Sequence, residues 1–213
     1  MTMSGTIPID PDFFNDGHFV VLLSQSRGGS GMDPHKLAGI LGDGDVEPMK
    51  DLLRRGICLP IYFGTDCAMD SATSFVVGEL DEAHEKAWIA RLTSKLAIPC
   101  GKLVLLSGGG VGEDMERAVS GKPPEKDFCI YQTIDVPPGD YRVDVFAYVD
   151  SVTVGLHEDN EDLEPEEMAE KYKHLATVRE SYVVQLTPLK GDLPLPQLTE
   201  ETNWPGVFEF RRP

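Results

Sequence analysis

Two apolar segments of alternating pattern flank the sequence Pro-Pro-Gly-Asp at 137–140, and they constrain the fold more than any other feature. Alternation with a period of two, rich in β-branched and aromatic residues, is typical of β-strands. Proline fixes φ at the start of a turn and glycine permits a positive φ, so 137–140 favours a tight reversal. We therefore predict an antiparallel hairpin with strands over 128–136 and 141–150. Each strand has one mostly apolar face and one mixed face, as in an antiparallel sheet covered on one side.

Other short apolar segments also have the length and composition of strands. Pro60 lacks an N–H group, so its segment is expected at a sheet edge or a bulge. The predicted further strands cover 18–24, 57–63, 74–80, 102–106, 182–187 and 207–210.

Two segments have the clearest helical signals, and shorter helices are possible at 113–119 and 165–174. Asp45 is placed to cap a helix over 46–55, with acidic residues early and basic residues late, as the helix dipole favours. Asp81 is placed to cap a longer helix over 82–96, where apolar residues recur at helical spacing. That apolar stripe consists of Trp88, Ile89, Leu92 and Leu96.

Predicted strands outnumber predicted helices and do not alternate with them. This favours a mainly β fold, an antiparallel β-sandwich-like domain with two or three short helices. An α+β fold with one antiparallel sheet is the alternative. We expect one β-rich domain over 1–213, with an irregular N-terminal lead-in at 1–17 and an extended, proline-containing C-terminal segment at 188–213.

The charge of the chain limits its partners. Nineteen Lys and Arg residues stand against 36 Asp and Glu residues, a formal net charge of −17. This charge repels the phosphate backbone of nucleic acids and acidic membrane surfaces, and it attracts a basic protein. We therefore predict no direct nucleic-acid binding, no membrane association and a possible basic protein partner. The oligomeric state stays open.

The compartment is predicted from three observations. Residues 1–12 lack the cationic start and apolar core of a signal peptide, and no apolar run reaches the roughly 18 residues that span a bilayer. The four cysteines have no C-x-x-C spacing, which argues against zinc binding and thioredoxin-like chemistry. We predict a cytoplasmic protein with reduced thiols.

The most acidic stretch is 150–170, which holds nine acidic residues and no Lys or Arg. Such a run is either a solvated loop, a weak calcium binder or a surface that meets a basic partner. We predict the last of these and no metal. The predicted interaction surface consists of Glu158, Asp159, Glu161, Asp162, Glu164, Glu166 and Glu167.

Glycine-rich stretches do not match the phosphate-binding patterns. After Gly108 and Gly110 the third glycine of a dinucleotide fingerprint is due at position 113, which is Glu113. At Gly121-Lys122 the next residue is Pro123, which does not fit a phosphate loop. We predict no cofactor.

Candidate catalytic and calcium-binding groups are few. Ser30 lies in a sequence that approaches G-x-S-x-G, but the closing glycine comes one position early. The most testable enzyme hypothesis is a hydrolase that uses Ser30 or Cys67 with His35. Asp43, Asp45 and Glu47 alternate on a predicted loop, where helix capping and solvation explain them better than calcium binding.

Together these observations predict a non-catalytic interaction protein, similar in kind to an inhibitor or immunity protein, that presents an acidic surface to a basic protein. Inhibitors of nucleases or toxins are one such class, because an acidic surface can imitate the charge of the substrate. The alternative is a small hydrolase or small-ligand-binding protein with a pocket formed by the glycine-rich loops at 27–31 and 107–112.

Overall fold

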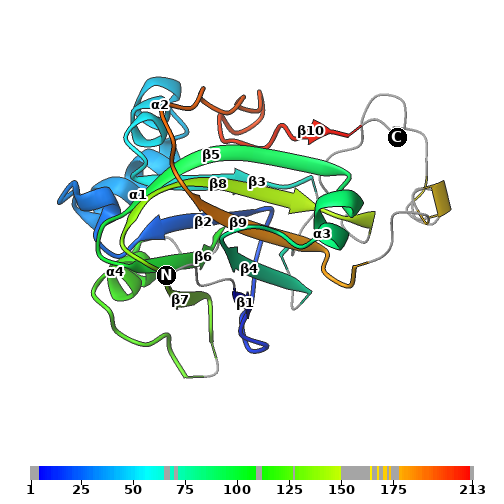
Figure 1. The fold of residues 1–213 in the computed structure, drawn as a ribbon. Helices are drawn as coiled ribbons and strands as arrows, with labels where there is room; N and C mark the ends of the chain where they lie inside the picture. Colours follow the sequence, from blue (N-terminus) through cyan, green and yellow to red (C-terminus); the bar gives the residue numbers. More distant parts are fainter. Residues whose placement is uncertain are drawn as a thin grey trace.

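The computed structural model describes residues 5–64, 68–69, 72–108, 112–126, 128–149, 164, 167, 170–171, 173 and 178–211. This described part contains ten strands, arranged in two sheets, and four α-helices (Figure 1). The predicted mostly β fold with short helices is therefore confirmed, although the helices number four and not two or three. The assignment of the whole chain to one domain stays a prediction.

The larger sheet has six strands in the order β1-β4-β9-β8-β5-β10. Its neighbours are antiparallel except β4 and β9, which run parallel. The pairing of β1 with β4 shows that the N-terminal segment predicted to be irregular contains a strand. The strands are β1 (Gly5–Pro8), β4 (Thr73–Val77), β5 (Ala90–Ile98), β8 (Gly139–Ala147), β9 (Tyr182–Pro188) and β10 (Glu209–Phe210).

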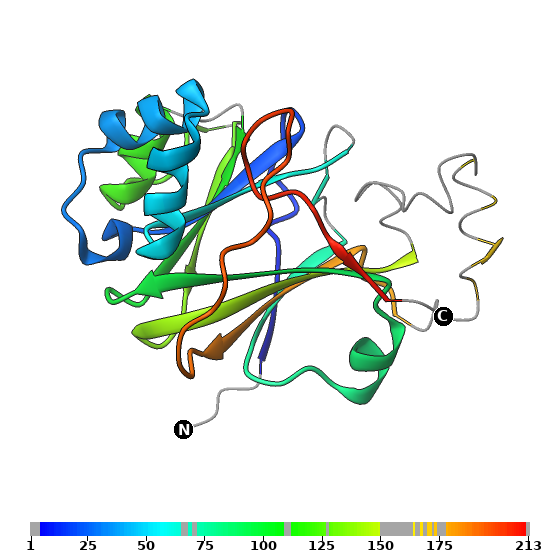
Figure 2. The same cartoon turned by 90° about the horizontal axis from the view of Figure 1, so that it is seen from above.

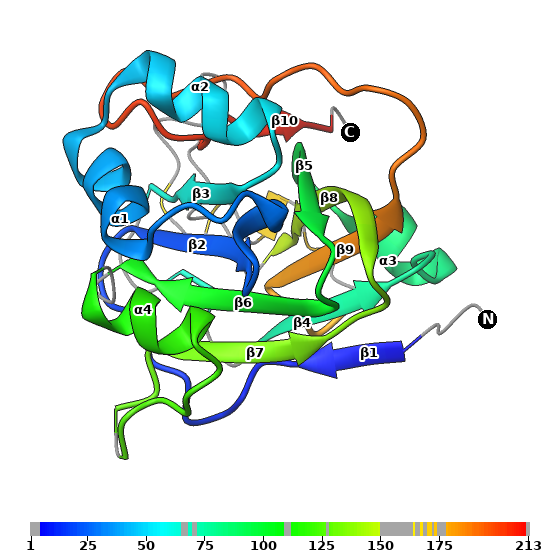
Figure 3. The same cartoon turned by 90° about the vertical axis from the view of Figure 1, so that its left-hand side faces the viewer.

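The smaller sheet has four antiparallel strands in the order β3-β2-β6-β7 (Figure 3). Pro60 lies in β3, an edge strand, as predicted from its missing N–H group. The strands are β2 (Phe19–Ser24), β3 (Cys58–Tyr62), β6 (Lys102–Ser107) and β7 (Tyr131–Asp135).

The helices lie in two places (Figure 2). Helices α1, α2 and α4 gather beside the four-stranded sheet, whereas α3 lies at the six-stranded sheet. No helix in the described ranges is long and apolar enough to cross a membrane. The bounds are α1 (Pro34–Asp43), α2 (Val46–Arg54), α3 (Glu82–Ala87), α4 (Glu113–Val119) and a short 3-10 helix at Arg27–Gly29.

The main core lies between the two sheets and continues under α1, α2 and α4. Val20, Val21, Leu22 and Leu23 of β2 are all fully buried. A strand that is buried on both faces requires apolar residues at every position. This explains why 20–23 is a continuous apolar run, unlike the alternating strands.

The predicted hairpin over 128–150 is wrong. β7 pairs with β6 in the four-stranded sheet, whereas β8 pairs with β5 and β9 in the six-stranded sheet. The sequence Pro-Pro-Gly-Asp therefore carries the chain from one sheet to the other. A period-two pattern shows which residues share a face of a strand, but it does not select the neighbouring strand.

The predicted helix over 82–96 is also wrong beyond its first turns. Asp81 caps α3 as expected, since its carboxylate accepts a hydrogen bond from the N–H group of His84, but α3 ends at Ala87. From Ala90 the chain forms β5, whose residues alternate between buried and partly exposed. Leu92 and Leu96 are four positions apart, a spacing that puts residues on one face of either a helix or a strand.

Candidate functional site

The predicted acidic surface lies mostly outside the described residues. Glu164 and Glu167 are described, both exposed, and the N–H group of Glu164 donates to Oε2 of Glu167 at 3.1 Å. The other five lie outside the described part: Glu158, Asp159, Glu161, Asp162 and Glu166. This surface therefore stays a prediction.

The predicted Ser30–His35 pair is not formed. The Ser30 hydroxyl donates to the carbonyl of Arg27 at 2.7 Å and accepts from the N–H group of Met32 at 3.1 Å. His35 instead lies 3.3 Å from a carboxylate oxygen of Glu116, and its side chain is well exposed. Cys67 lies outside the described residues. Ser30 therefore acts as a turn residue.

The described parts of the two glycine-rich loops lie at opposite ends of one strand pair. In the antiparallel pairing of β2 and β6, Ser24 is opposite Leu103 and Val20 is opposite Ser107. The loop at 27–31 follows one end of this strand pair, and Gly108 follows the other end. The described residues of the two loops therefore do not line one pocket, and residues 109–111 lie outside the described part.

Two of the carboxylates considered for calcium, Asp45 and Glu47, lie at the start of α2. Asp45 occupies the N-cap position of α2 without a side-chain capping bond, and Glu47 lies 3.2 Å from the ammonium group of Lys50. Within the described ranges, no group of three or more His, Cys, Asp or Glu side chains could hold a metal ion.

The most distinctive surface feature is an exposed pair of aromatic rings. Phe14 and Phe128 are 48% and 47% exposed, although large apolar side chains are ordinarily covered. Their ring centroids are 6.3 Å apart with an interplanar angle of 41°. The pair joins two segments that are far apart in the sequence, and contiguous exposed apolar surface commonly marks an interaction site. We call Phe14 and Phe128 the aromatic pair.

The backbone holds the aromatic pair in place. The N–H group of Phe14 donates to the carbonyl of Cys129 at 2.8 Å, and Phe13 and Cys129 form a β-bridge. The N–H group of Asp16 donates to the hydroxyl of Ser107 at the end of β6. Hydrogen bonds therefore fix the backbone on both sides of Phe14. This limits the conformations from which the ring can meet a partner.

Carboxylates lie close to the residue that follows Phe128. Burial raises the pKa of the Cys129 thiol, and the nearby charges of Asp10 and Asp12 raise it further. Asp10, Asp12 and Asp16 are exposed, and no Lys or Arg occurs between residues 5 and 26. The surface at the aromatic pair is therefore apolar at its centre and acidic on the Phe14 side.

The sequence pattern does not indicate this pair, for a clear reason. The pattern of 128–136 predicts Phe128 on the apolar face of a strand, and it indicates no role for Phe14, which lies in the lead-in. Strand β7 begins only at Tyr131, so Phe128 lies before the strand and turns outward. The available signal was the pair of consecutive phenylalanines at 13 and 14 in an acidic stretch.

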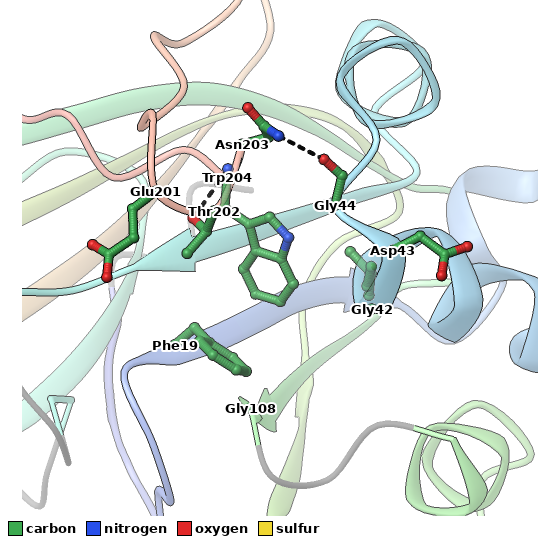
Figure 4. A pocket seen from close by; sticks show the side chains of 10 residues that line it. Phe19, Gly42, Asp43, Gly44, Gly108, Glu201, Thr202, Asn203 and Trp204 are labelled. Carbon is green, nitrogen blue, oxygen red and sulfur yellow. Dashed lines mark hydrogen bonds between the residues drawn. The ribbon is translucent and has the colours of Figure 1, made fainter.

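A separate hollow of about 360 Å³ lies beyond the end of β6 (Figure 4). Its walls come from the C-terminal end of α1, from Phe19 at the start of β2, from Gly108 and from the loop at 201–204. The loop is joined to the helix end by a hydrogen bond of 2.8 Å from Nδ2 of Asn203 to the carbonyl of Gly44.

Comparisons with known proteins do not show a family for this chain. No family model matches the chain, and no curated protein matches its sequence. Among solved structures, one described as crocagin biosynthetic gene J is 14% identical with a TM-score of 0.40, covering 88% of this chain and 96% of that chain. ComJ from Bacillus subtilis, described as an inhibitor of the DNA-degrading activity of NucA, is 7% identical with a TM-score of 0.33, covering 83% and 92%. Likeness at this level says nothing about the function of this chain.

Proposed function

We propose that this protein is a non-catalytic interaction protein that binds a basic protein through the surface centred on the aromatic pair. The observation that carries the proposal is the pairing of two half-exposed phenylalanine rings near the exposed residues Asp10, Asp12 and Asp16. Aromatic residues that fill a partner's pocket commonly supply most of an interface's binding energy. The backbones of both segments are held by hydrogen bonds and β-bridges, so little backbone ordering is needed on binding.

The charge supports a basic partner. A protein with a net charge of −17 attracts a positively charged surface over several ångströms, and this raises the association rate. The same charge disfavours direct contact with nucleic acid. The acidic run at 158–167 belongs to this proposal as a second region that steers the partner. A basic enzyme whose own substrate is anionic fits this surface, in which case the protein acts as an inhibitor.

The first test compares three baits in an extract of the source cell: the native protein, F14S/F128S and the matched control V207S. Val207 is also a large apolar residue exposed on the surface, but it lies in the C-terminal segment before β10. We expect the native protein and V207S to retain the same basic protein, and F14S/F128S to lose it. The captured protein is then purified and its affinity measured at two salt concentrations.

With the purified partner, F14S/F128S is expected to weaken binding at least about tenfold, which corresponds to about 1.4 kcal/mol. Replacing Asp10 and Asp12 by Asn is expected to slow association and to reduce its salt dependence. Circular dichroism of each variant checks the fold. Equal binding by F14S/F128S, or a captured partner that is acidic, would contradict the proposal.

A further inference from the structure

One sheet edge beside the aromatic pair has backbone groups that point away from the sheet. Strand β7 lies at the edge of the four-stranded sheet, with β6 as its neighbour (Figure 3). The N–H group of Ser107 donates to the carbonyl of Ile130 at 2.8 Å. The N–H group of Val136 donates to the carbonyl of Gly101 at 3.0 Å. Because such bonds occur at alternate residues of an antiparallel pair, the even-numbered residues face β6 and the odd-numbered residues face outward.

The first position on this outward edge is already paired. The carbonyl of Cys129 accepts the N–H group of Phe14 at 2.8 Å, and Cys129 forms a parallel β-bridge with Phe13. Within the described ranges, the outward N–H and C=O groups of Tyr131 and Thr133 have no backbone partner, and the Tyr131 carbonyl has only a 3.6 Å contact with the Cys129 thiol. Unpaired groups along an edge strand are a template for a further extended chain.

A groove of about 540 Å³ lies at this edge. Successive side chains of a strand point to opposite faces. Tyr131 lies on the same face as residues 123–124, since its hydroxyl donates to the carbonyl of Lys122 at 3.1 Å. Gln132 lies on the opposite face, where its Oε1 accepts the N–H group of Asp10 at 2.9 Å. The groove therefore has a proline-rich side and a side that carries a carboxylate.

The charges of the groove also differ between these two sides. Lys102 and Lys122 line it on the proline-rich side, and Lys102 forms an ion pair with Asp135. On the other side Asp10 is exposed, and its carboxylate accepts the N–H group of Asp12, which is exposed as well. A strand added here would therefore direct basic side chains toward Asp10 and apolar side chains toward residues 123–124.

We propose that an extended segment of the partner protein pairs with the outer edge of β7 and adds a fifth strand to the four-stranded sheet. Hydrogen bonds to the backbone of Tyr131 and Thr133 hold this segment, and the alternation of its apolar and basic side chains provides the specificity. The inference rests on the proposed function in one respect, because it assigns the segment to the basic partner that contacts the aromatic pair.

Two observations favour a basic partner over a second copy of this chain. Phe128 immediately precedes Cys129, and Phe14 pairs with Cys129, so the aromatic pair adjoins the open edge and one partner can contact both. A second copy would bring its own Asp10 and Asp12 to the edge, and each copy has a formal net charge of −17. Like charges oppose such pairing, whereas a basic segment is attracted.

The test uses a short peptide in which valine alternates with lysine, acetylated at its N-terminus and amidated at its C-terminus. The control peptide has glutamine in place of lysine. In ¹⁵N-labelled protein, we expect the lysine peptide to shift the amide signals of Tyr131 and Thr133 with saturation in the millimolar range and to slow the exchange of both amides with solvent. We expect the glutamine peptide to bind at least about fivefold more weakly.

Two proline substitutions provide matched variants. Proline removes the N–H group, which an edge strand tolerates where that group points to solvent, so T133P blocks the open edge of β7. T6P is the control, because Thr6 is also an exposed threonine of an edge strand, β1. The N–H group of Ile9 donates to the carbonyl of Thr73 on β4, so Thr6 directs its backbone groups away from the sheet.

We expect T133P to weaken binding of the lysine peptide at least about tenfold and T6P to change it less than about twofold. Circular dichroism checks the fold of each variant, and if T133P does not fold, the amide shifts of the native protein decide. Absent shifts at Tyr131 and Thr133, equal binding of the two peptides, or equal binding by folded T133P and T6P would overturn the inference. A native dimer that becomes a monomer in T133P would overturn it too, because a second copy would then occupy the edge.

This inference and the proposed function fail on different measurements. F14S/F128S keeps the backbone of β7, so it should bind the lysine peptide like the native protein while losing the partner protein. If the peptide does not bind, the inference fails, and capture of a basic protein by the native bait still decides the proposed function. If the peptide binds and no basic protein is captured, the edge accepts a basic strand and the proposed function alone fails.

Discussion

Asp144 accepts two hydrogen bonds from Arg142, from Nε to Oδ2 at 2.6 Å and from Nη2 to Oδ1 at 2.8 Å. The two residues are two positions apart on β8, so they share the face that points away from the main core. The Asp144 side chain is only 4% exposed, whereas Arg142 reaches solvent. Thr93 on β5 donates a third hydrogen bond to the same carboxylate.

Removing Arg142 should therefore destabilise the protein strongly. R142M leaves the buried carboxylate with Thr93 alone, and loss of one partner of a buried ion pair costs roughly 3–5 kcal/mol. We expect a decrease of about 3 kcal/mol in the free energy of unfolding, measured with urea. R142M/D144L removes both charges and should regain most of this loss. A decrease below about 1 kcal/mol in R142M would contradict the prediction.

His84 should make stability depend on pH. Its ring nitrogens lie 2.8 Å from Oδ1 of Asp81 and 3.1 Å from Oε2 of Glu180, and its carbonyl accepts from the hydroxyl of Tyr148. Burial lowers the pKa of His84, but hydrogen bonds to Asp81 and Glu180 outweigh burial and raise the pKa above 6.5. The stabilisation is then fully present below pH 6.5 and is lost as the pH rises through the folded-state pKa.

We expect the native protein to exceed H84Q in unfolding free energy at pH 5.5 and to lose this advantage by pH 9. Urea unfolding at both values measures the difference, and an NMR titration of His84 measures its pKa. E180Q should lower that pKa, because it removes one carboxylate from the ring. A native advantage that grows with rising pH would refute this assignment.

The described cysteines should differ in reactivity. Burial raises the pKa of Cys58 on β3 to about 12, so its thiolate is scarce at neutral pH. Partial burial acts to raise the pKa of Cys100, but hydrogen bonds from Ser26 and from backbone groups prevail and lower it below 9.0. Iodoacetamide at pH 8, followed by peptide mapping, should modify Cys100 at least about a hundredfold faster than Cys58. Comparable rates would show that Cys58 is accessible.

Gly108→Ala should destabilise the protein and disturb the hollow, because the added methyl group would overlap Phe19. Overpacking of this kind costs about 1–3 kcal/mol. The Trp204 indole signal should shift as well, since Phe19 packs on Trp204. Gly139→Ala is the matched control, because its nearest neighbour is 3.8 Å from the added atom. Equal stability of G108A and G139A would contradict the packing that we describe.

Several local features were predictable from the sequence. The alternating pattern of 141–147 correctly indicated that Tyr141, Val143 and Val145 share the face toward the core. Pro60 indicated an edge strand, and Asp81 indicated a helix start. Each of these depends on backbone chemistry within a few residues, which holds whatever the rest of the chain does.

Strand partners were not predictable in the same way. Pro-Pro-Gly-Asp suggested a hairpin, yet β8 pairs with β5, a segment whose leucine spacing also fitted a helix. A strand pattern leaves its backbone N–H and C=O groups open to any neighbour of suitable register. The choice was made by which apolar faces could be covered together in the core.

The sequence by itself determined the acidic charge, the strand-rich composition and the inward faces of most strands, because these follow from side-chain chemistry and short-range periodicity. The tertiary structure alone decided that Phe14 meets Phe128 and that the end of α1 meets Trp204. Contacts between distant segments depend on how all the strands pair at once, and the loop-closure entropy of each contact is repaid only when the shared core forms.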